Sequence, residues 1–467
     1  MRPAIVWFRR DLRLADNPAL NRAIDFDRPI LPVYVIDELD MGGAARWWLH
    51  GSLSALRDDL AELGGGLRVL SGDPATVLAE LAAGIDAEVI YCSHRYESDA
   101  QAQLTRMRSS LPESVRLNAA HGGLLTEPGS VVTGSGSVFK VFTPFYKAAS
   151  RVMVPEPETR SPANFHSTSR EPDDGALATL LPALDWADGF GDVWQPGEAA
   201  AQARLDAATK IAQNYGELRD RPDLEGTSRL SPHLHFGELS VRDAWHRLSH
   251  AANAEPLIRQ LYWREFSYHL LVENPHMPTE PLRQEFADFP WVEDEELLKT
   301  WQKGLTGYPI VDAGMRQLWK TGWMHNRVRM IVASFLVKHL LVPWQHGADW
   351  FLDTLVDADL ANNSAGWQWV AGCGTDATPY FRIFNPITQG KKFDVTGDYV
   401  REFVPELARV PVKFIHDPWN APADMLAASG VRLGEDYPRP IVDHPEARQR
   451  ALDAYQLSRD LLKSATD

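Results

Sequence analysis

The chain has 467 residues, of which 44% are hydrophobic and 24% charged, and its formal net charge is −16. This composition is typical of a globular protein, and the length predicts two domains. Only Cys92 and Cys373 occur, and no apolar run reaches the roughly 18 residues of a membrane span, which argues against a disulfide framework, a cysteine metal site and a transmembrane protein. The N-terminus lacks a signal-peptide pattern, so we expect a cytoplasmic protein without a metal.

Residues 1–125 alternate short apolar runs with helical patterns. The apolar runs lie at 4–8, 30–36, 67–70 and 87–92, and a helical pattern covers 46–63. This alternation predicts a doubly wound parallel α/β sheet, in which ligands usually bind where the strands end. The sequence Gly134-Ser-Gly136 lacks the third glycine and the strand–helix setting of a dinucleotide-binding loop.

The pattern changes after the first 130 residues. Residues 152–194 are rich in Pro, Ser and Asp, which predicts an interdomain linker over 131–195. Helical patterns follow at 198–215, 240–251, 256–274, 313–321 and 325–341. The sequence therefore predicts an α/β domain over 1–130, a linker, and an all-α domain over 196–467.

Two stretches of the helical domain crowd polar and aromatic residues together. Residues 357–369 contain two acids, adjacent amides and two tryptophans, and residues 322–330 add a second such cluster. Nine of the sixteen tryptophans lie between Trp263 and Trp369. This mixture suits a flat, redox-active ligand held by hydrogen bonds, although a Trp-rich helical core would have the same composition.

The distribution of charge matters more than its sum. Five basic residues and no acid lie between Arg316 and Lys338, and Lys391 and Lys392 follow later. A local basic surface could neutralise DNA phosphates on an otherwise acidic protein. Ordinary solvated charges would give the same pattern.

Several long motifs in a fixed order carry a family resemblance. They lie at 5–13, 226–231, 263–266, 306–316, 322–330, 357–369, 376–386 and 437–441. With them the chain resembles the photolyase/cryptochrome family over essentially its whole length, and bacterial class I cyclobutane pyrimidine dimer photolyases most closely. The resemblance implies that the first domain is of the antenna type and that the helical domain binds FAD.

The resemblance also implies a set of flavin contacts. Thr227, Ser228 and Ser231 would supply hydroxyls to the pyrophosphate, although this segment alone would fit an ordinary helix cap. Asp357 would pair with Arg329, and Asn363 would lie beside flavin N5, where Asn favours a photolyase over a plant-type cryptochrome. The full set is Tyr215, Thr227, Ser228, Arg229, Leu230, Ser231, Arg264, Arg329, Asp357, Ala358, Asp359 and Asn363.

Three tryptophans match the electron-transfer chain of the family. Trp367, Trp344 and Trp291 would carry electrons from the protein surface to the flavin, since indole is the most easily oxidised of the suitable rings. Three indoles packed in a core would occupy the same positions.

Further residues resemble the DNA contacts of the family. Trp263 and Trp369 would enclose a flipped pyrimidine dimer, and Asn326 and Met330, at i and i+4, would contact it. Arg219, Arg327, Gln389 and Lys391 would contact phosphates. Gln260 departs from the Glu of most cyclobutane photolyases and matches (6-4) photolyases, but the two histidines of the latter are absent.

Together these residues predict light-dependent repair of cyclobutane pyrimidine dimers, by electron transfer from excited reduced FAD to the flipped-out dimer. A (6-4) photolyase and a non-repairing cryptochrome-type photoreceptor are the alternatives. The expected partner is UV-damaged DNA, and we expect a monomer without an obligate protein partner. Residues 44–50 and 95–100 align with the second-chromophore region, but Ala100 replaces a Glu of folate-binding members, so deazaflavin, folate, flavin and an empty site stay open.

Overall fold

The computed structural model describes residues 1–466 except 38–40, 161–164, 169–174, 182–184 and 378–381. Part of the 376–386 motif therefore lies outside the described residues. The chain forms two compact units. Unit 1 comprises Met1–Tyr215, Ser228–Pro275 and Val356–Ala361, and unit 2 comprises Gly216–Thr227, His276–Leu355 and Asn362–Asp467.

Unit 1 is built on a five-stranded parallel sheet with the strand order β3-β2-β1-β4-β5. The strands are β1 (Ala4–Phe8), β2 (Ile30–Ile36), β3 (Arg68–Ser71), β4 (Val89–Ser93) and β5 (Arg116–Ala120). β1 and β4 are buried along their whole length, as expected for parallel strands covered on both faces. The predicted parallel sheet is confirmed, but β5 was missed, because its sequence RLNAA contains no continuous apolar run.

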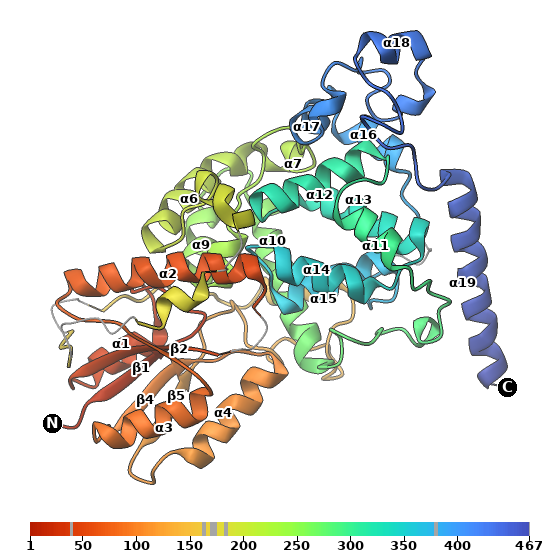
Figure 1. Ribbon diagram of the computed structural model, residues 1–467. Helices are drawn as coiled ribbons and strands as arrows, with labels where there is room; N and C mark the ends of the chain where they lie inside the picture. Colours follow the sequence, from red (N-terminus) through yellow and green to blue (C-terminus); the bar gives the residue numbers. More distant parts are fainter. Residues whose placement is uncertain (38–40, 161–164, 169–174, 182–184, 378–381, 467) are drawn as a thin grey trace. The chain divides into compact units, whose positions relative to one another are not determined.

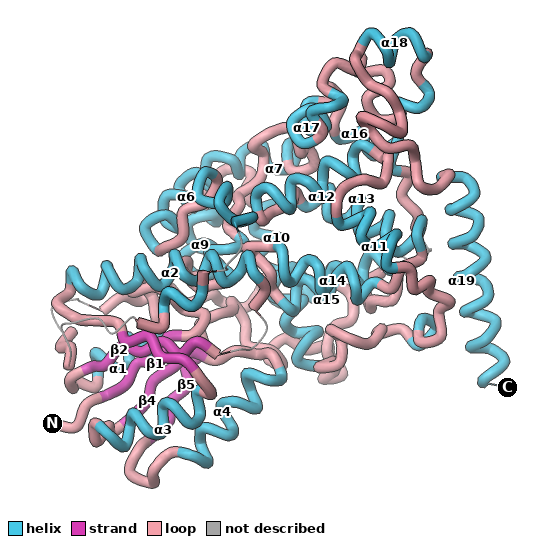
Figure 2. The backbone as a smooth tube through the Cα atoms, viewed as in Figure 1, coloured by secondary structure: helices cyan, strands magenta, loops and turns pink. Residues whose placement is uncertain are grey.

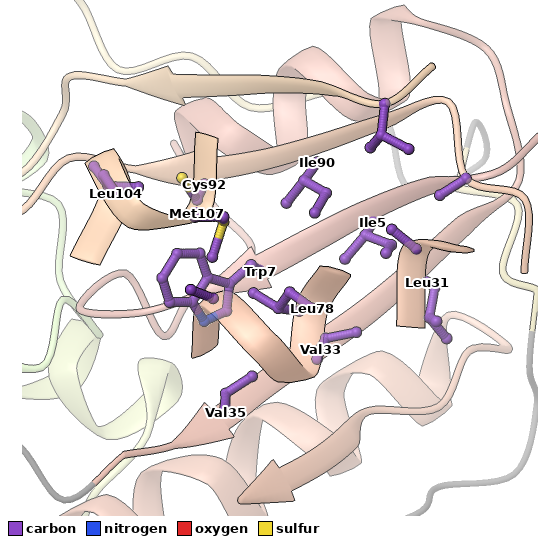
Figure 3. Close-up of a cluster of buried hydrophobic side chains, with 14 residues drawn as sticks. Ile5, Trp7, Leu31, Val33, Val35, Leu78, Ile90, Cys92, Leu104 and Met107 are labelled. Carbon is purple, nitrogen blue, oxygen red and sulfur yellow. The ribbon is translucent and has the colours of Figure 1, made fainter. Parts of the chain in front are cut away.

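Four helices connect the strands of unit 1. They are α1 (Pro18–Asp25), α2 (Gly43–Glu62), α3 (Pro74–Gly84) and α4 (Ser98–Ser110). Figure 1 shows α3 and α4 on one face of the sheet and α2 on the opposite face. The core under α3 and α4 contains Ile5, Trp7 and Val33 from the strands and Leu78 and Met107 from the helices (Figure 3).

The rest of unit 1 is helical. Its elements are α5 (Phe142–Ala149), η2 (Leu177–Leu180), η3 (Asp185–Asp192), α6 (Glu198–Ile211), η4 (Ala212–Asn214), α8 (Ser231–His235), α9 (Val241–Ser249) and α10 (Glu255–Glu273), and α7 (Tyr215–Leu218) leads into unit 2. The described part of the expected linker packs on the α/β layer: Ile30 N donates to His166 O, and Glu158 N donates to Asp16. The compact units are divided differently from the predicted boundaries at 130 and 196, since unit 1 runs without a break from Met1 to Tyr215.

Unit 2 consists of helices and loops; among the described residues, strands occur only in unit 1 (Figure 2). Its elements are η5 (Gln284–Phe286), α11 (Glu295–Gln302), α12 (Pro309–Thr321), α13 (Asn326–Ser334), η6 (Phe335–Leu340), α14 (Trp344–Thr354), α15 (Leu360–Ala371, which begins in unit 1), α16 (Pro386–Phe393), α17 (Asp398–Phe403), η7 (Pro405–Leu407), η8 (Pro418–Asn420), α18 (Ala423–Ala428) and α19 (His444–Thr466). The helix predicted over 325–341 is an α-helix, α13, continued by the π-helical turn η6. Within the described part of the chain, no helix has the combined length and apolarity needed to cross a membrane.

Two of the sequence motifs meet at a buried carboxylate of unit 2. Asp312 accepts hydrogen bonds from Thr306 N (2.7 Å), Thr306 Oγ1 (2.6 Å), Gly307 N (3.0 Å) and Tyr437 OH (2.6 Å). Gly307 has φ +78°, and a Cβ there would lie 2.4 Å from the backbone of Arg439. The 306–316 and 437–441 motifs therefore fasten a loop and the C-terminal segment to α12.

Candidate functional site

The loop that precedes α15 holds two buried acids, Asp357 and Asp359. Asp357 accepts a hydrogen bond from Ser231 Oγ at 2.6 Å. Asp359 accepts one from Tyr268 OH at 2.5 Å, and its Oδ2 lies 3.2 Å from His235 Nδ1. Helices α8 and α10, which carry Ser231, His235 and Tyr268, therefore fix both carboxylates in unit 1.

The surroundings of Asp359 keep it ionised. Burial alone would raise the pKa of Asp359, but contacts with His235 and Tyr268 and the nearby Arg264 guanidinium hold it below its usual range. Burial and the positive charge of Arg10 lower the pKa of His235 to about 4. Asp359 is therefore an anion beside an imidazole that is neutral at pH 7.

The predicted phosphate-binding segment leads directly into α8. Arg229 adopts a left-handed conformation with φ +51°, after which Leu230 and Ser231 begin the helix. The hydroxyls of Thr227 and Ser228 lie in partly exposed positions beside this turn. His235 Nε2, at the other end of α8, is buried without a hydrogen-bond partner among the described residues. Hydroxyls, acids and an unsatisfied imidazole nitrogen fit the polar groups of FAD.

Arg264 and Tyr215 also belong to unit 1. Arg264 Nη1 donates to Gly123 O at 2.8 Å, and its guanidinium lies 5.2 Å above the Tyr268 ring. Tyr215 is 7% exposed. Arg264 is thus held in place by backbone of the 120s loop, which the sequence did not indicate.

Glu265, the neighbour of Arg264, is a buried acid outside the predicted set. Its Oε2 accepts from Thr126 N at 2.9 Å and from Thr126 Oγ1 at 3.3 Å. Burial raises the pKa of Glu265 to about 7, although Arg264 and Thr126 act in the opposite direction. Because the folded-state pKa is raised, this group stabilises the fold fully below about pH 4.5, and the contribution is lost as the pH rises through about 7.

Glu265→Gln should therefore stabilise the protein at pH 8 and leave it nearly unchanged at pH 5. Gln can still accept from Thr126 but carries no charge to desolvate, and the full pKa shift corresponds to about 3 kcal/mol. The measurement is the difference in thermal midpoint between variant and parent from pH 5 to pH 8. A difference that does not change with pH would contradict the assignment.

Two predicted flavin contacts, Asn363 and Arg329, lie in unit 2. Asn363 Nδ2 donates to Ala348 O at 3.0 Å, which orients the amide and leaves Oδ1 as its acceptor. Arg329 Nε donates to Met324 O at 2.8 Å. The expected ion pair of Arg329 with Asp357 would join the two units and stays a prediction.

The three predicted redox tryptophans all belong to unit 2. Trp367 is 3% exposed and packs against Gly347, where an added Cβ would lie 2.1 Å from the indole. Gly347 is one helical turn after Trp344 on α14, and Trp344 is 1% exposed. Trp291 is only partly buried, and the next residue, Val292, donates its N–H to Leu341 O at 2.8 Å, just before α14. Two of the three indoles are thus buried and the third is partly exposed, and the electron-transfer chain itself stays a prediction.

Trp263, on α10, has a partner that the sequence did not predict. Its ring stacks on Phe142 of α5 with centroids 3.6 Å apart and planes 8° apart. Phe142 therefore covers one face of the indole. Gln260 lies one turn earlier on α10, and its Nε2 donates to Pro256 O at 3.0 Å. Trp369 is partly exposed in unit 2, and its predicted pairing with Trp263 is untested.

The residues predicted to contact the dimer lie at the start of α13. Asn326 is exposed as the first residue of the helix, and Met330 follows one turn later in a partly exposed position. The preceding His325 is 2% exposed, and its Nδ1 accepts from Arg327 N at 3.2 Å. Arg219 and Gln389 are partly exposed.

The basic surface expected between Arg316 and Lys338 is largely neutralised. Arg316 pairs with Glu406 at 2.6 Å, and Arg327 pairs with Asp220 at 2.9 Å. Lys338 is 1% exposed and donates to Ala371 O, so it is a buried residue. Lys391 pairs with Asp417 at 3.0 Å. The expectation was wrong for Lys338 and incomplete for the others, because their partners lie far away in the sequence.

A hollow opens at the carboxyl ends of β1 and β2 in unit 1. It is lined by Trp7, Phe8, Arg9, Arg10, Tyr34, Val35, Asp37, Met41, Arg95 and Phe236. Arg95 comes from the predicted second-chromophore region, and its partner Glu97 lies 3.1 Å away. Ala100 is 1% exposed, whereas Arg46 is partly exposed and Asp99 exposed; none of these three lines the hollow.

Comparison with known proteins places this geometry in context. The model described as "DNA photolyase" matches residues 4–163, and the model described as "FAD binding domain of DNA photolyase" matches residues 257–457. A deoxyribodipyrimidine photo-lyase of Agrobacterium fabrum is 47% identical, with 97% of each chain covered. Cryptochrome-1 of Arabidopsis thaliana is 36% identical over 97% of this chain and 70% of its own length.

A crystal structure of a bacterial class III photolyase from Agrobacterium tumefaciens superimposes with a TM-score of 0.93. Its sequence is 46% identical, and 98% of each chain is covered. The subgroup suggested by the sequence motifs, class I, therefore needs correction, since this strong similarity is to a class III enzyme.

Proposed function

The chain belongs to the photolyase/cryptochrome family, and from this premise we propose that it repairs cyclobutane pyrimidine dimers in DNA in a light-dependent reaction. The observation that carries the proposal is the arrangement of α10. Gln260, Trp263, Arg264 and Tyr268 lie at i, i+3, i+4 and i+8, so they share one side of this helix. Helix α10 therefore holds both Trp263, which would stack on a base, and Tyr268, which contacts the acid Asp359.

FAD would bind at the polar groups around Asp357 and Asp359 in unit 1, where Ser228 and Ser231 would bind its phosphates. When bound and reduced, FAD would supply one electron to the dimer after absorbing light and would take it back once the two ring C–C bonds have broken. No atom is gained or lost by the DNA, so the protein needs no acid or base for the cleavage.

The side chains of α10 would bind the dimer outside the helix. Flipping the lesion out of the duplex costs a few kcal/mol, and stacking on an aromatic ring recovers about 1–3 kcal/mol per base. Phe142 stacks on one face of Trp263, which fixes the indole plane, and the opposite face is the one that would stack on a pyrimidine. Gln260, one turn away, would hydrogen-bond the polar edge of the base.

His325 argues against the alternative (6-4) reaction. That reaction is thought to need a histidine as proton donor, and His325 is the histidine nearest to the positions of Asn326 and Met330. It is buried, and its Nδ1 is used to cap α13. Nδ1 of this imidazole therefore serves the start of the helix.

The direct test is illumination of chemically reduced protein with oligonucleotides that carry one lesion type each. We expect repair of the cyclobutane dimer and none of the (6-4) product. Gln260→Glu should raise the quantum yield or leave it unchanged, since a charge-assisted hydrogen bond is about twice as strong as a neutral one. Repair of only the (6-4) product would overturn the assignment, and repair of neither lesion would favour a photoreceptor.

The ion pair of Arg327 with Asp220 gives a second test, on DNA affinity. Asp220 competes with a phosphate for the guanidinium, so Asp220→Asn should strengthen binding to dimer-containing DNA. Arg327→Ala should weaken it and reduce the slope of log affinity against log salt by about one unit. Filter binding at several salt concentrations measures both the affinity for dimer-containing DNA and its salt slope. An unchanged slope in Arg327→Ala would remove this residue from the phosphate contacts.

The hollow at the strand ends is the position where we would place the second chromophore that the sequence left open. Its lining includes the three arginines Arg9, Arg10 and Arg95, the acid Asp37, and the aromatic rings of Tyr34 and Phe236. An anionic, aromatic molecule such as a deazaflavin, a folate or a flavin would suit the arginines and the rings. Extraction of the purified protein and absorption spectroscopy of the released pigments would identify it.

A further inference from the structure

The imidazole of His235 lies between an arginine of the hollow and an acid of the flavin site. Arg10 follows β1 and lines the hollow, and its Nη1 is 2.8 Å from His235 Nδ1. The same Nδ1 is 3.2 Å from Asp359 Oδ2. All three residues belong to unit 1 and are held by the sheet, by α8 and by the loop before α15.

These two contacts of Nδ1 exclude each other as hydrogen bonds. A guanidinium has only donors, so a hydrogen bond with Arg10 requires a lone pair on Nδ1. A carboxylate has only acceptors, so a hydrogen bond with Asp359 requires a proton on Nδ1. A neutral imidazole carries one proton, on Nε2 in the first case and on Nδ1 in the second. His235 can therefore serve Arg10 or Asp359, but not both.

The other ring nitrogen, Nε2, does not determine which tautomer His235 adopts. His235 Nε2 is buried without a hydrogen-bond partner among the described residues, so no acceptor there retains its proton. Tyr268 OH donates to Asp359 in either case, which keeps the acid in place. The tautomer is then decided by whether Arg10 is engaged with Nδ1. The shorter distance, to Arg10, favours the proton on Nε2 in the structure described.

We propose that His235 is a positioning residue whose tautomer couples Arg10 in the hollow to Asp359 in the flavin site. A ligand that accepts a hydrogen bond from Arg10 releases Nδ1, and the imidazole proton moves from Nε2 to Nδ1 and is donated to Asp359. The net charge is unchanged, because one proton only changes its position. Coupling of this kind is reciprocal, so occupancy of the hollow and binding at the flavin site alter each other. The inference rests on the proposed function, in which Asp359 contacts FAD.

The first test observes the tautomer itself and does not depend on bound FAD. The full-length protein is labelled with ¹⁵N-histidine, and the signals of His235 are assigned by their loss in His235→Gln. We expect an unprotonated Nδ1 in the parent protein and a protonated Nδ1 in Arg10→Leu, in which the donor is gone. The same protonation state in both proteins would overturn the proposal.

The second test measures FAD affinity on the deflavinated full-length chain. In His235→Phe the one hydrogen bond that Nδ1 makes, to Arg10 or to Asp359, is lost, and the dissociation constant for FAD should rise about tenfold, as for loss of one hydrogen bond to a charged group. His235→Gln should stay within about twofold, because one amide can accept from Arg10 and donate to Asp359 at the same time. Thermal midpoints of the variants show that each is folded.

The variant Asp359→Asn distinguishes a failure of the coupling through His235 from a failure of the proposed flavin site. If it weakens FAD binding while His235→Phe does not, the flavin site stands and the coupling through His235 is wrong. If it leaves FAD binding unchanged, Asp359 is not a flavin contact, and the proposed function itself fails at this site. If His235→Phe is unfolded, the comparison of Arg10→Leu with the parent protein still decides the tautomer.

Discussion

Trp344→Phe should slow the light-driven reduction of oxidised flavin by at least about tenfold and leave repair by chemically reduced enzyme unchanged. Phenylalanine preserves most of the packing around this buried position but is far harder to oxidise than indole. Trp344 lies one turn before Gly347, against which Trp367 packs. Breaking the chain at its middle member would isolate Trp367 from the surface. Absorption spectra recorded after successive periods of illumination give the rate of flavin reduction. A dimer-repair assay gives the repair activity of the chemically reduced enzyme.

Trp291→Phe should have the same effect, because the partly exposed member passes the oxidising equivalent to solvent. Trp419→Phe is the matched control: this indole packs on Tyr308 at 5.2 Å, also in unit 2, and has no assigned redox role. In Trp419→Phe, light should reduce the flavin at the same rate as in the parent protein. Loss of repair in pre-reduced Trp344→Phe would show that this tryptophan has a structural role or contacts the substrate.

The fold was predictable where one periodicity dominates the sequence. Apolar runs located β1, β2, β3 and β4 to within about two residues, and their alternation with helices indicated the parallel sheet. The edge strand β5 was missed, since two of its five residues are exposed and two more are only partly buried. The composition of residues 131–195 suggested an interdomain linker, and it did not indicate the backbone hydrogen bonds through which the described part packs on unit 1.

The sequence predicted which residues belong to the site, but it did not predict which of them contact each other. Asp359 was found through the family motif, but its partners Tyr268 and His235 lie 91 and 124 positions away. The pairing of Arg327 with Asp220 spans 107 positions. Such contacts depend on tertiary packing. His233 and His235 both lie in the last turn of α8, where basic residues are common, so the sequence carried no distinctive signal for the role of His235.

The stacking of Trp263 on Phe142 predicts a large and selective loss of affinity. Trp263→Ala should weaken binding to dimer-containing DNA by about tenfold to hundredfold, as expected for losing 1–3 kcal/mol of base stacking. Binding to undamaged DNA should change little, because that affinity depends on phosphate contacts. Titration of labelled oligonucleotides with and without a single dimer provides the comparison.

Substitutions of Phe142 test whether the Trp263 indole needs a stacked ring that fixes its plane. In Phe142→Ala the indole keeps its own surface but loses the ring that fixes its plane, so affinity for the dimer should fall by less than in Trp263→Ala. Phe142→Leu restores apolar contact without a flat ring and should lie between the parent and Phe142→Ala. An equal loss on damaged and undamaged DNA in Trp263→Ala would mean that Trp263 supports the fold of α10 rather than the flipped base. A selective loss in Trp263→Ala, with a smaller one in Phe142→Ala, would place the base on the face opposite Phe142, since Phe142 occupies the other face in the free protein.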